Sequence, residues 1–410
     1  MVSSLSHAAS RSGEVILDIS RLISRVHYST PSGVDRVEMA YARGLLDHYG
    51  DRLAFAAVHP CGLYGRLSRR AVLAYLDELE SRWSSQEGNP HRRSLASSLP
   101  WLVSLLPSRT KRSSVGAVYV QASPHHLTRT EQVRRILARE KARFLCLVHD
   151  LIPIEFPEYA RVSGDSQHRQ RIATIAALAD GVIVNSAATG RSLQPWLESS
   201  GRRVDVHVAL LGTETLPAAE PFQLGGGRPY FVCLGTIEPR KNHLLLLNLW
   251  RHLAQTLEPQ SVPRLIVIGR RGWENEQVVD MLERCPALKG HVEELNGCSD
   301  ARMASLLRGA RALLMPSFAE GYGMPVAEAL SVGTPVICSD LPALREAGGD
   351  APDYLSPLDG PGWQALILDH AGRGPLHTAQ MLRLPHWHMP RWNEHVGIVA
   401  DAIAALQQRS

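Results

Sequence analysis

The chain has 410 residues, of which 44% are hydrophobic and 20% charged, and its net charge at neutral pH is +4. This composition is that of a soluble globular protein, and the length predicts two domains of roughly 200 residues each. The small net charge argues against a general nucleic-acid surface, and the apolar runs are shorter than the roughly 20 residues of a membrane-spanning helix.

Two further features of the composition concern the compartment. The six cysteines stand singly, without the paired spacing of zinc sites or disulfide frameworks. The N-terminus lacks the apolar core of a secretory signal. We therefore expect the protein in the cytoplasm or at the inner face of the cell membrane.

Short apolar runs alternate with amphipathic stretches along the whole chain, which is typical of α/β proteins with parallel sheets covered on both faces. In the first half, strands are predicted at residues 15–18, 52–58, 117–121, 144–148, 181–185 and 204–208.

Two places in the first half indicate a ligand site. Gly33 begins a predicted helix, although an ordinary helix start is the alternative. His149 ends the fourth predicted strand, at the sheet edge where open α/β folds bind ligands, although a lone histidine is more often structural. Asn185 and Ser186 end the fifth strand and are weaker candidates at the same edge.

Residues 92–112 combine an apolar stretch containing Trp101 with basic flanks. The flanking basic residues are Arg92, Arg93, Arg109, Lys111 and Arg112. Such a segment can lie in a membrane interface and contact anionic headgroups. The alternative is a helix buried against the first sheet, or a mobile loop.

Residues 216–229 interrupt the pattern with three prolines and three consecutive glycines at 225–227, which is typical of a linker. The glycines lack the preceding strand and the spacing of a dinucleotide-binding loop. The α/β pattern then restarts, with strands predicted at 230–234, 264–268, 291–295, 312–315 and 335–338, and an amphipathic helix at 392–407.

Arg240 and Lys241 follow the first strand of the second half. Two adjacent cations at the carboxyl end of a strand can neutralise a diphosphate, although such a pair is also common in a solvated turn. The chain contains no Walker-type lysine loop and no Asp-x-Asp pair. We therefore expect no metal, and assign the positive charge to these two side chains.

The segment from Glu320 to Glu328 follows a buried strand and leads through a glycine loop into a short helix. Gly321 and Gly323 let the backbone approach a ligand, and the amides at the helix start can bind a diphosphate. The two glutamates flank this anion site and can accept hydrogen bonds from hydroxyl groups, which indicates a sugar on one side and a ribose on the other. The alternative is a capped helix with a solvated Glu320.

Taken together, these motifs resemble the retaining glycosyltransferases of the GT-B fold, in family 4, which is marked by two glutamates separated by seven residues. Matches cover most of the chain, at residues 32–36, 148–153, 184–186, 212–214, 235–242, 269–273 and 316–320. The resemblance implies two Rossmann-like α/β domains facing across a cleft: 1–215 for the acceptor, 216–390 for the nucleotide-sugar donor, and a C-terminal helix, 391–410, that crosses back onto the first domain.

The resemblance also implies roles for individual residues. Arg240 and Lys241 would neutralise the diphosphate, Glu328 would bind the ribose, and His149 would contact the donor sugar near its reacting carbon. The donor sugar would be held by Glu320, Gly321, Tyr322, Gly323 and Met324.

The resemblance implies three further positions that contact the donor. Gly33 would let the donor phosphate approach the first domain, and Asn296 and Gly297 would hold the nucleobase. Many relatives carry an arginine directly after the glycine that matches Gly235, but Thr236 stands here. The diphosphate charge is therefore predicted to rest on Arg240 and Lys241 alone.

The resemblance implies transfer of a hexose of the mannose or glucose type, with retained configuration, from GDP-mannose or UDP-glucose. The acceptor would be a glycan, linked to polyprenyl diphosphate if residues 92–112 contact a membrane, in bacterial surface polysaccharide synthesis. No nucleic-acid partner and no cofactor beyond the nucleotide sugar are expected. The alternatives are a sugar phosphorylase or nucleotide-sugar epimerase on the same architecture, and a protein that binds a nucleotide sugar without transferring it.

Overall fold

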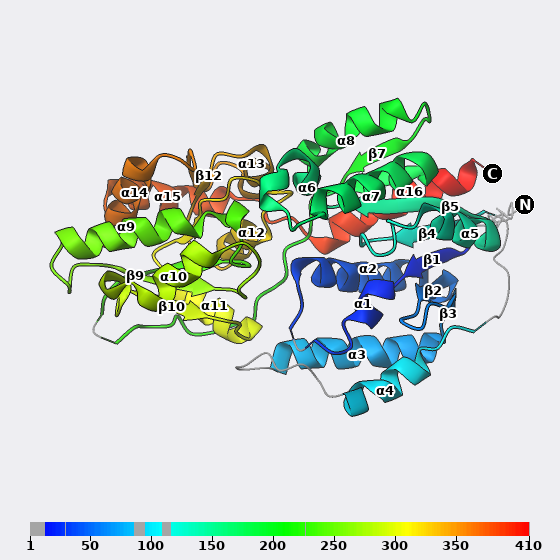
Figure 1. The fold of residues 1–410 in the computed structure, drawn as a ribbon, viewed down its shortest axis with the longest axis horizontal. Helices are drawn as coiled ribbons and strands as arrows, with labels where there is room; N and C mark the ends of the chain where they lie inside the picture. Colours follow the sequence, from blue (N-terminus) through cyan, green and yellow to red (C-terminus); the bar gives the residue numbers. More distant parts are fainter. Residues whose placement is uncertain (1–12, 29, 86–94, 109–115, 226, 410) are drawn as a thin grey trace, which may run out of the picture.

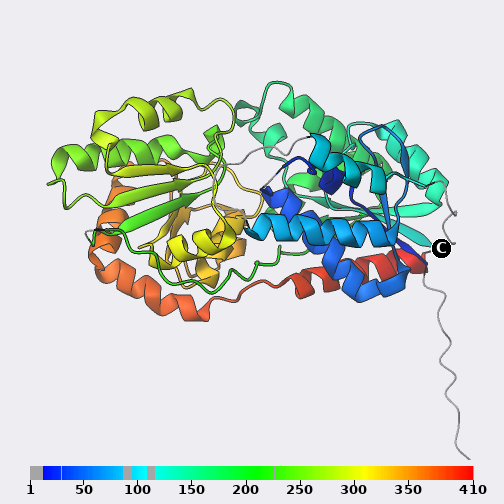
Figure 2. The same ribbon diagram turned by 90° about the horizontal axis from the view of Figure 1, so that it is seen from below.

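The computed structural model describes residues 13–28, 30–85, 95–108, 116–225 and 227–409. They form two α/β domains side by side, each built around one sheet (Figures 1 and 2). This confirms the predicted architecture. No described helix has both the length and the apolar character needed to cross a bilayer.

The first domain contains a seven-stranded sheet in the order β3-β2-β1-β4-β5-β6-β7. Its strands are β1 Val15–Asp18, β2 Leu53–Val58, β3 Tyr64–Arg66, β4 Ala117–Gln121, β5 Ala142–Val148, β6 Gly181–Val184 and β7 Asp205–Val208. The six predicted strands are present, with ends shifted by at most two residues. The sheet is parallel, as predicted, except at one edge, where the short, unpredicted strand β3 pairs antiparallel with β2.

Helices cover both faces of this sheet. They are α1 Ser20–Ser24, α2 Gly33–Tyr49, α3 Arg69–Ser85, α4 Leu95–Ser104, α5 Thr130–Glu140, α6 Ile152–Glu155, α7 Gly164–Leu178 and α8 Ala187–Ser199. Alternate strand residues enter opposite cores: Val15 and Leu17 pack beneath α2, whereas Ile16 packs on the side of α5 and α8. Burial on both faces explains why these strands are nearly continuous apolar runs in the sequence.

The second domain contains a six-stranded parallel sheet in the order β10-β9-β8-β11-β12-β13. Its strands are β8 Tyr230–Leu234, β9 Arg264–Ile268, β10 Val292–Leu295, β11 Leu313–Met315, β12 Val336–Ser339 and β13 Asp353–Leu355. Its helices are α9 His243–Thr256, α10 Glu276–Arg284, α11 Asp300–Gly309, α12 Met324–Ser331, α13 Pro342–Gly348, α14 Gly360–Gly372 and α15 Pro375–Arg383. The edge strand β13 was not predicted.

The last helix, α16 (Trp392–Gln408), crosses back and packs against α2, β4, β6 and β7 of the first domain, as predicted. Its buried side chains Val396, Val399 and Ile403 join the first-domain core. The two connections between the domains lie together, because the Thr213 N–H donates to the Pro390 carbonyl at 2.9 Å. Figure 2 shows both running along the same side of the molecule.

Candidate active site

A cavity of about 430 Å³ lies between the two domains, at the carboxyl ends of β5, β8, β9 and β11 and at the start of α2. It brings together nearly all of the residues that the sequence singled out. Those lining it are Gly33, His149, Asn185, Gly235, Thr236, Arg240, Lys241, Gly297, Glu320, Gly321, Tyr322, Gly323, Met324 and Glu328. Asn296 and Ser186 do not line it, and Asn296 is exposed.

Glu320, Arg240 and Lys241 form one buried ion cluster. The Lys241 Nζ lies 2.6 Å from Glu320 Oε1, and an Arg240 guanidinium nitrogen lies 2.8 Å from Glu320 Oε2. Arg240 also pairs with Glu238 at 2.6 Å. Burial alone would raise the pKa of Glu320, but the charges of Arg240 and Lys241 outweigh it and lower that pKa to about 2.

The sequence did not show that Glu320 pairs with both cations. Charges taken out of water must be paired, and here the two cations are paired with the two carboxylates of Glu320 and Glu238. A diphosphate entering the cavity would therefore compete with Glu320 for Arg240 and Lys241.

The start of α12 lies beside this cluster and can receive an anion. Gly323 precedes the helix with φ 110° and provides no side-chain cap. In the first turn, Pro325 has no N–H and the Val326 N–H donates to the Gly323 carbonyl at 2.9 Å, which leaves the Met324 N–H available to an anion. A side chain at Gly323 would also collide with Leu344, since a Cβ there would lie 2.4 Å from its Cδ2 atom. On the other side, Gly33 brings α2 close to Met324.

Glu328 lies deeper in the cavity, next to a pair of charges that joins the two domains. Arg36 of α2 binds Asp300 of α11 through two hydrogen bonds of 2.6 and 3.1 Å. Burial raises the pKa of Glu328 to about 7, because the positive charge of Arg36 only partly offsets burial and the repulsion from Asp300 and Glu214. Glu328 thus changes its protonation state near neutral pH.

His149 lines the cavity as predicted, and its ring has a defined tautomer. Its Nε2 lies 2.8 Å from the Ala122 carbonyl, which can only accept, so Nε2 carries the proton and Nδ1 keeps a lone pair. Burial lowers the pKa of His149, with a smaller contribution from Arg21 in the same direction. The ring is therefore neutral and can accept one hydrogen bond through Nδ1.

Asn185 and Ser186 hold backbone groups around the cavity. The Asn185 amide donates to the His149 carbonyl at 2.8 Å, and the Ser186 hydroxyl donates across the domain boundary to the Gly321 carbonyl at 2.8 Å. A Cβ at Gly321 would lie 2.3 Å from the His149 carbonyl oxygen. This close approach explains why a glycine is needed at 321.

Tyr322 has a structural role that the sequence did not indicate. Its side chain is buried in the first-domain core, and its hydroxyl donates to the Leu211 carbonyl at 3.0 Å. Glu346 also joins the domains, because its carboxylate accepts the Ala187 and Ala188 amides at the start of α8, at 2.5 and 2.9 Å. Direct contacts between the domains thus border the cavity.

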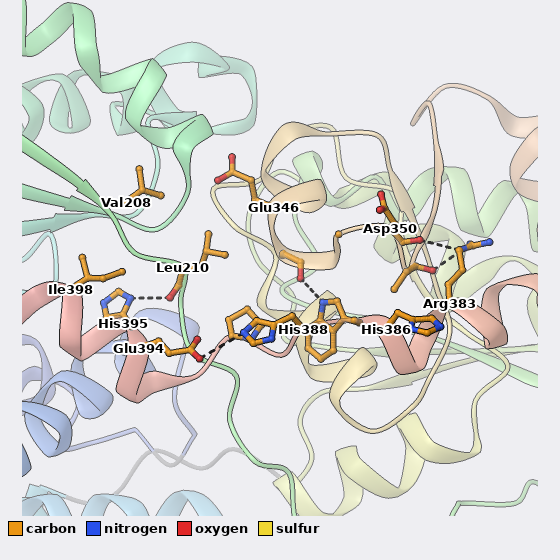
Figure 3. A pocket seen from close by; sticks show the side chains of 15 residues that line it. Val208, Leu210, Glu346, Asp350, Arg383, His386, His388, Glu394, His395 and Ile398 are labelled. Carbon is orange, nitrogen blue, oxygen red and sulfur yellow. Dashed lines mark hydrogen bonds and ion pairs between the residues drawn. The ribbon is translucent and has the colours of Figure 1, made fainter.

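A second cavity, of about 620 Å³, lies where the chain crosses between the domains (Figure 3). Several of its polar groups are already paired: His395 with the Leu210 carbonyl at 3.0 Å, His388 with Glu394 at 3.7 Å, and Arg383 with the Asp350 carbonyl at 2.9 Å. None of the predicted site residues lines this cavity.

Sequence reasoning missed the charged residues that complete the active-site cavity. Glu238 could have been suspected from its place beside Arg240. Asp300 and Arg36 could not, because they pair across 264 residues of sequence. Arg270 also lines the cavity, and its guanidinium donates to the Thr30 carbonyl of the first domain at 3.0 Å.

Two parallel α/β domains that face each other across such a cavity define the GT-B fold. The same fold is found in sucrose-phosphate synthase from Thermosynechococcus elongatus, which is similar to this chain with a TM-score of 0.65 and 16% identity, over 97% of this chain and 100% of that one. Residues 218–352, which lie almost entirely in the second domain, match the family Glycosyl transferases group 1.

Curated relatives are similar to parts of the chain. O-antigen chain mannosyltransferase B of Escherichia coli is 37% identical over 155 residues, which are 38% of this chain and 40% of the relative. Serotype-specific mannosyltransferase WbdA of Escherichia coli is 26% identical over 236 residues, which are 53% of this chain and 28% of the relative. The similarity therefore spans less than half of the length of either relative.

Proposed function

We propose that this protein is a metal-independent, retaining mannosyltransferase that moves mannose from GDP-mannose to a lipid-linked glycan in bacterial surface polysaccharide synthesis. The observation that carries the proposal is the buried cluster of Glu320, Arg240 and Lys241 at the start of α12, which combines anion-binding and hydroxyl-binding groups. The similarity to O-antigen mannosyltransferases favours mannose over glucose.

In this proposal, the acceptor oxygen attacks the reacting carbon of the sugar while the bond between that carbon and the diphosphate breaks. Attack and departure take place on the same face of the sugar. The proton of the acceptor hydroxyl passes to the leaving diphosphate, so no side chain acts as nucleophile. Arg240, Lys241 and the Met324 amide at the start of α12 stabilise the charge that develops on the diphosphate. Glu320 and the Nδ1 atom of neutral His149 orient the sugar hydroxyls.

The proposal is tested by incubating the protein with GDP-mannose, or UDP-glucose for comparison, and a lipid-linked glycan. Release of the nucleoside diphosphate should require the acceptor and should be faster with GDP-mannose, and NMR should show retained configuration in the product. Binding of GDP-mannose without release would instead identify a nucleotide-sugar-binding protein and overturn the proposal.

The raised pKa of Glu328 predicts how donor binding depends on pH. If Glu328 accepts hydrogen bonds from the ribose, only its carboxylate form binds, and the protonated form must first lose its proton. Because that pKa is about 7, the affinity for GDP-mannose should be constant above about pH 8 and fall towards tenfold per pH unit below pH 7. Calorimetric titration between pH 5.5 and 8.5 measures this.

Glu328→Gln is the matched control, since the amide cannot titrate. The variant should bind GDP-mannose more weakly at pH 8 and show little dependence on pH. An unchanged pH profile in Glu328→Gln would contradict the assignment of the ribose to Glu328.

Membrane contact through residues 92–112 is part of the proposal, although residues 92–94 and 109–112 lie outside the described residues. Helix α4 has one side packed on the first-domain core through Trp101 and Leu102, and Leu105, directly after the helix, is part of that core. Its other side carries Leu99 and Val103, 58% and 57% exposed, and Leu106 follows at 49%. An apolar stripe of this kind beside basic residues fits a surface of anionic lipid.

Substituting serine for both Leu99 and Val103 should remove the protein from liposomes containing anionic lipid without changing its thermal unfolding. Exposed side chains contribute little to folding, whereas each would bury apolar area in the membrane interface. Liposome flotation measures this, and the matched control is serine at the exposed Leu376 of α15. Wild-type protein that stays in the soluble fraction would refute the membrane contact.

A further inference from the structure

Arg270 stands apart from the other basic residues of the active-site cavity. The basic side chains that line it are Arg36, Arg240, Lys241 and Arg270. The first three are held in ion pairs with carboxylates. Within the described ranges, no carboxylate forms an ion pair with Arg270. Its guanidinium group donates a hydrogen bond to a neutral group, the Thr30 carbonyl.

The fold places Arg270 beside Thr236, the position at which many relatives carry an arginine. The loop that follows β9 runs along the loop that follows β8, and the Ile237 N–H donates to the Arg270 carbonyl at 2.9 Å. A Cβ at Gly272 would lie 2.8 Å from Thr236 Cγ2, so the two loops are in close contact. Arg270 therefore occupies the same wall of the cavity as the uncharged Thr236.

Arg270 faces charges of the first domain. There, Arg21 and Arg25 share one carboxylate, that of Asp35, at 2.6 and 3.0 Å. Burial lowers the pKa of Arg270, repulsion from Arg25 adds to this effect, and the negative charge of Asp35 only partly offsets it. An anion bound at this end of the cavity would relieve that repulsion.

We propose that Arg270 binds phosphoryl oxygens of a substrate in this cavity. A guanidinium group presents paired N–H donors that match the oxygens of a phosphate. The phosphate would belong to the donor diphosphate or to a phosphate group of the acceptor, and the two share this chemistry. The inference rests on the proposed function, and it adds a phosphate contact that the Arg240 and Lys241 pair does not provide.

The test compares Arg270→Gln with Arg271→Gln. Arg271 is the neighbouring residue, does not line the cavity, and pairs on the surface with Glu283 and Glu294. Calorimetry measures the binding of GDP, UDP and the corresponding nucleosides. For a donor contact, Arg270→Gln should weaken nucleoside diphosphate binding by about tenfold to a hundredfold and leave nucleoside binding unchanged, whereas Arg271→Gln should match the wild type.

The second arm addresses the acceptor, with a synthetic polyprenyl diphosphate that carries one sugar. If Arg270→Gln keeps its affinity for nucleoside diphosphates but shows at least a tenfold higher KM for this acceptor, the contact is to the acceptor phosphate. Equal behaviour of Arg270→Gln and Arg271→Gln in both arms would overturn the inference and leave the proposed function intact.

Two other outcomes are also decisive. An equal loss of nucleoside and nucleoside diphosphate binding would show that Arg270 only ties the domains together through Thr30, and would overturn the inference. Failure of the wild-type protein to bind any nucleoside diphosphate would overturn the proposed function together with it.

Discussion

Lys241→Ala is expected to lower kcat by about a hundredfold to a thousandfold, the usual loss when one charge-stabilising donor is removed from an active site. Lys241 is buried, and its Nζ lies 2.6 Å from Glu320. In the proposed reaction, this ammonium group neutralises the departing diphosphate, which no neutral side chain can do. Steady-state rates of nucleoside diphosphate release, with GDP-mannose at saturation, measure the effect.

The same variant should disturb folding much less than turnover. Glu320 keeps its pair with Arg240 at 2.8 Å, so it is not left alone, and we expect a loss in unfolding free energy below about 3 kcal/mol. Lys289→Ala provides the control, because Lys289 is an exposed lysine of the same domain. Turnover in Lys241→Ala equal to that of Lys289→Ala would contradict the charge-neutralising role.

Ile403→Asp is expected to prevent the first domain from folding cooperatively. Ile403 is fully buried where α16 packs on the first domain. The substitution removes apolar contacts and places an unpaired carboxylate in the core, at a combined cost above about 4 kcal/mol against a total stability of about 5–15 kcal/mol. Thermal unfolding followed by near-ultraviolet circular dichroism should show a lost or strongly lowered transition.

Ala404→Asp makes a matched comparison, because Ala404 is adjacent but exposed. It should unfold like the wild type, and equal unfolding of the two variants would argue against a structural need for α16. Truncation at Pro390 is a less specific test of this coupling, since it uncovers every buried side chain of the helix at once.

The sequence predicted all the central strands and two of the four edge strands, and missed the other two edges, β3 and β13. Strands such as Phe231 to Cys233 are buried on both faces and therefore read as apolar runs. The missed strands β3 and β13 have only three residues each and lie at the edges of their sheets, where little apolar surface is buried. The equally short β11 was predicted because it is central and all three of its residues are buried apolar side chains.

Most of the residues that line the cavity could be predicted from the sequence, but the ion pairs among them could not. Each candidate stands at the end of an apolar strand or the start of a helix, and parallel sheets bring such positions together. The sequence could not show that Glu320 pairs with Lys241, 79 residues away, because that contact depends on how β8 and β11 lie side by side. The roles of these residues toward the donor remain predictions.

The paired connections between the domains restrict how the active-site cavity can open. The bond between Thr213 and Pro390 holds both connections together, and a Cβ at Gly212 would lie 2.3 Å from the Trp392 nitrogen. The domains are thus connected twice at one place, so a domain rotation that opens the cavity would have to use this place as its hinge. In such a rotation, contacts across the cavity such as the Arg36–Asp300 ion pair would break and re-form, while the hydrogen bond between Thr213 and Pro390 would be kept.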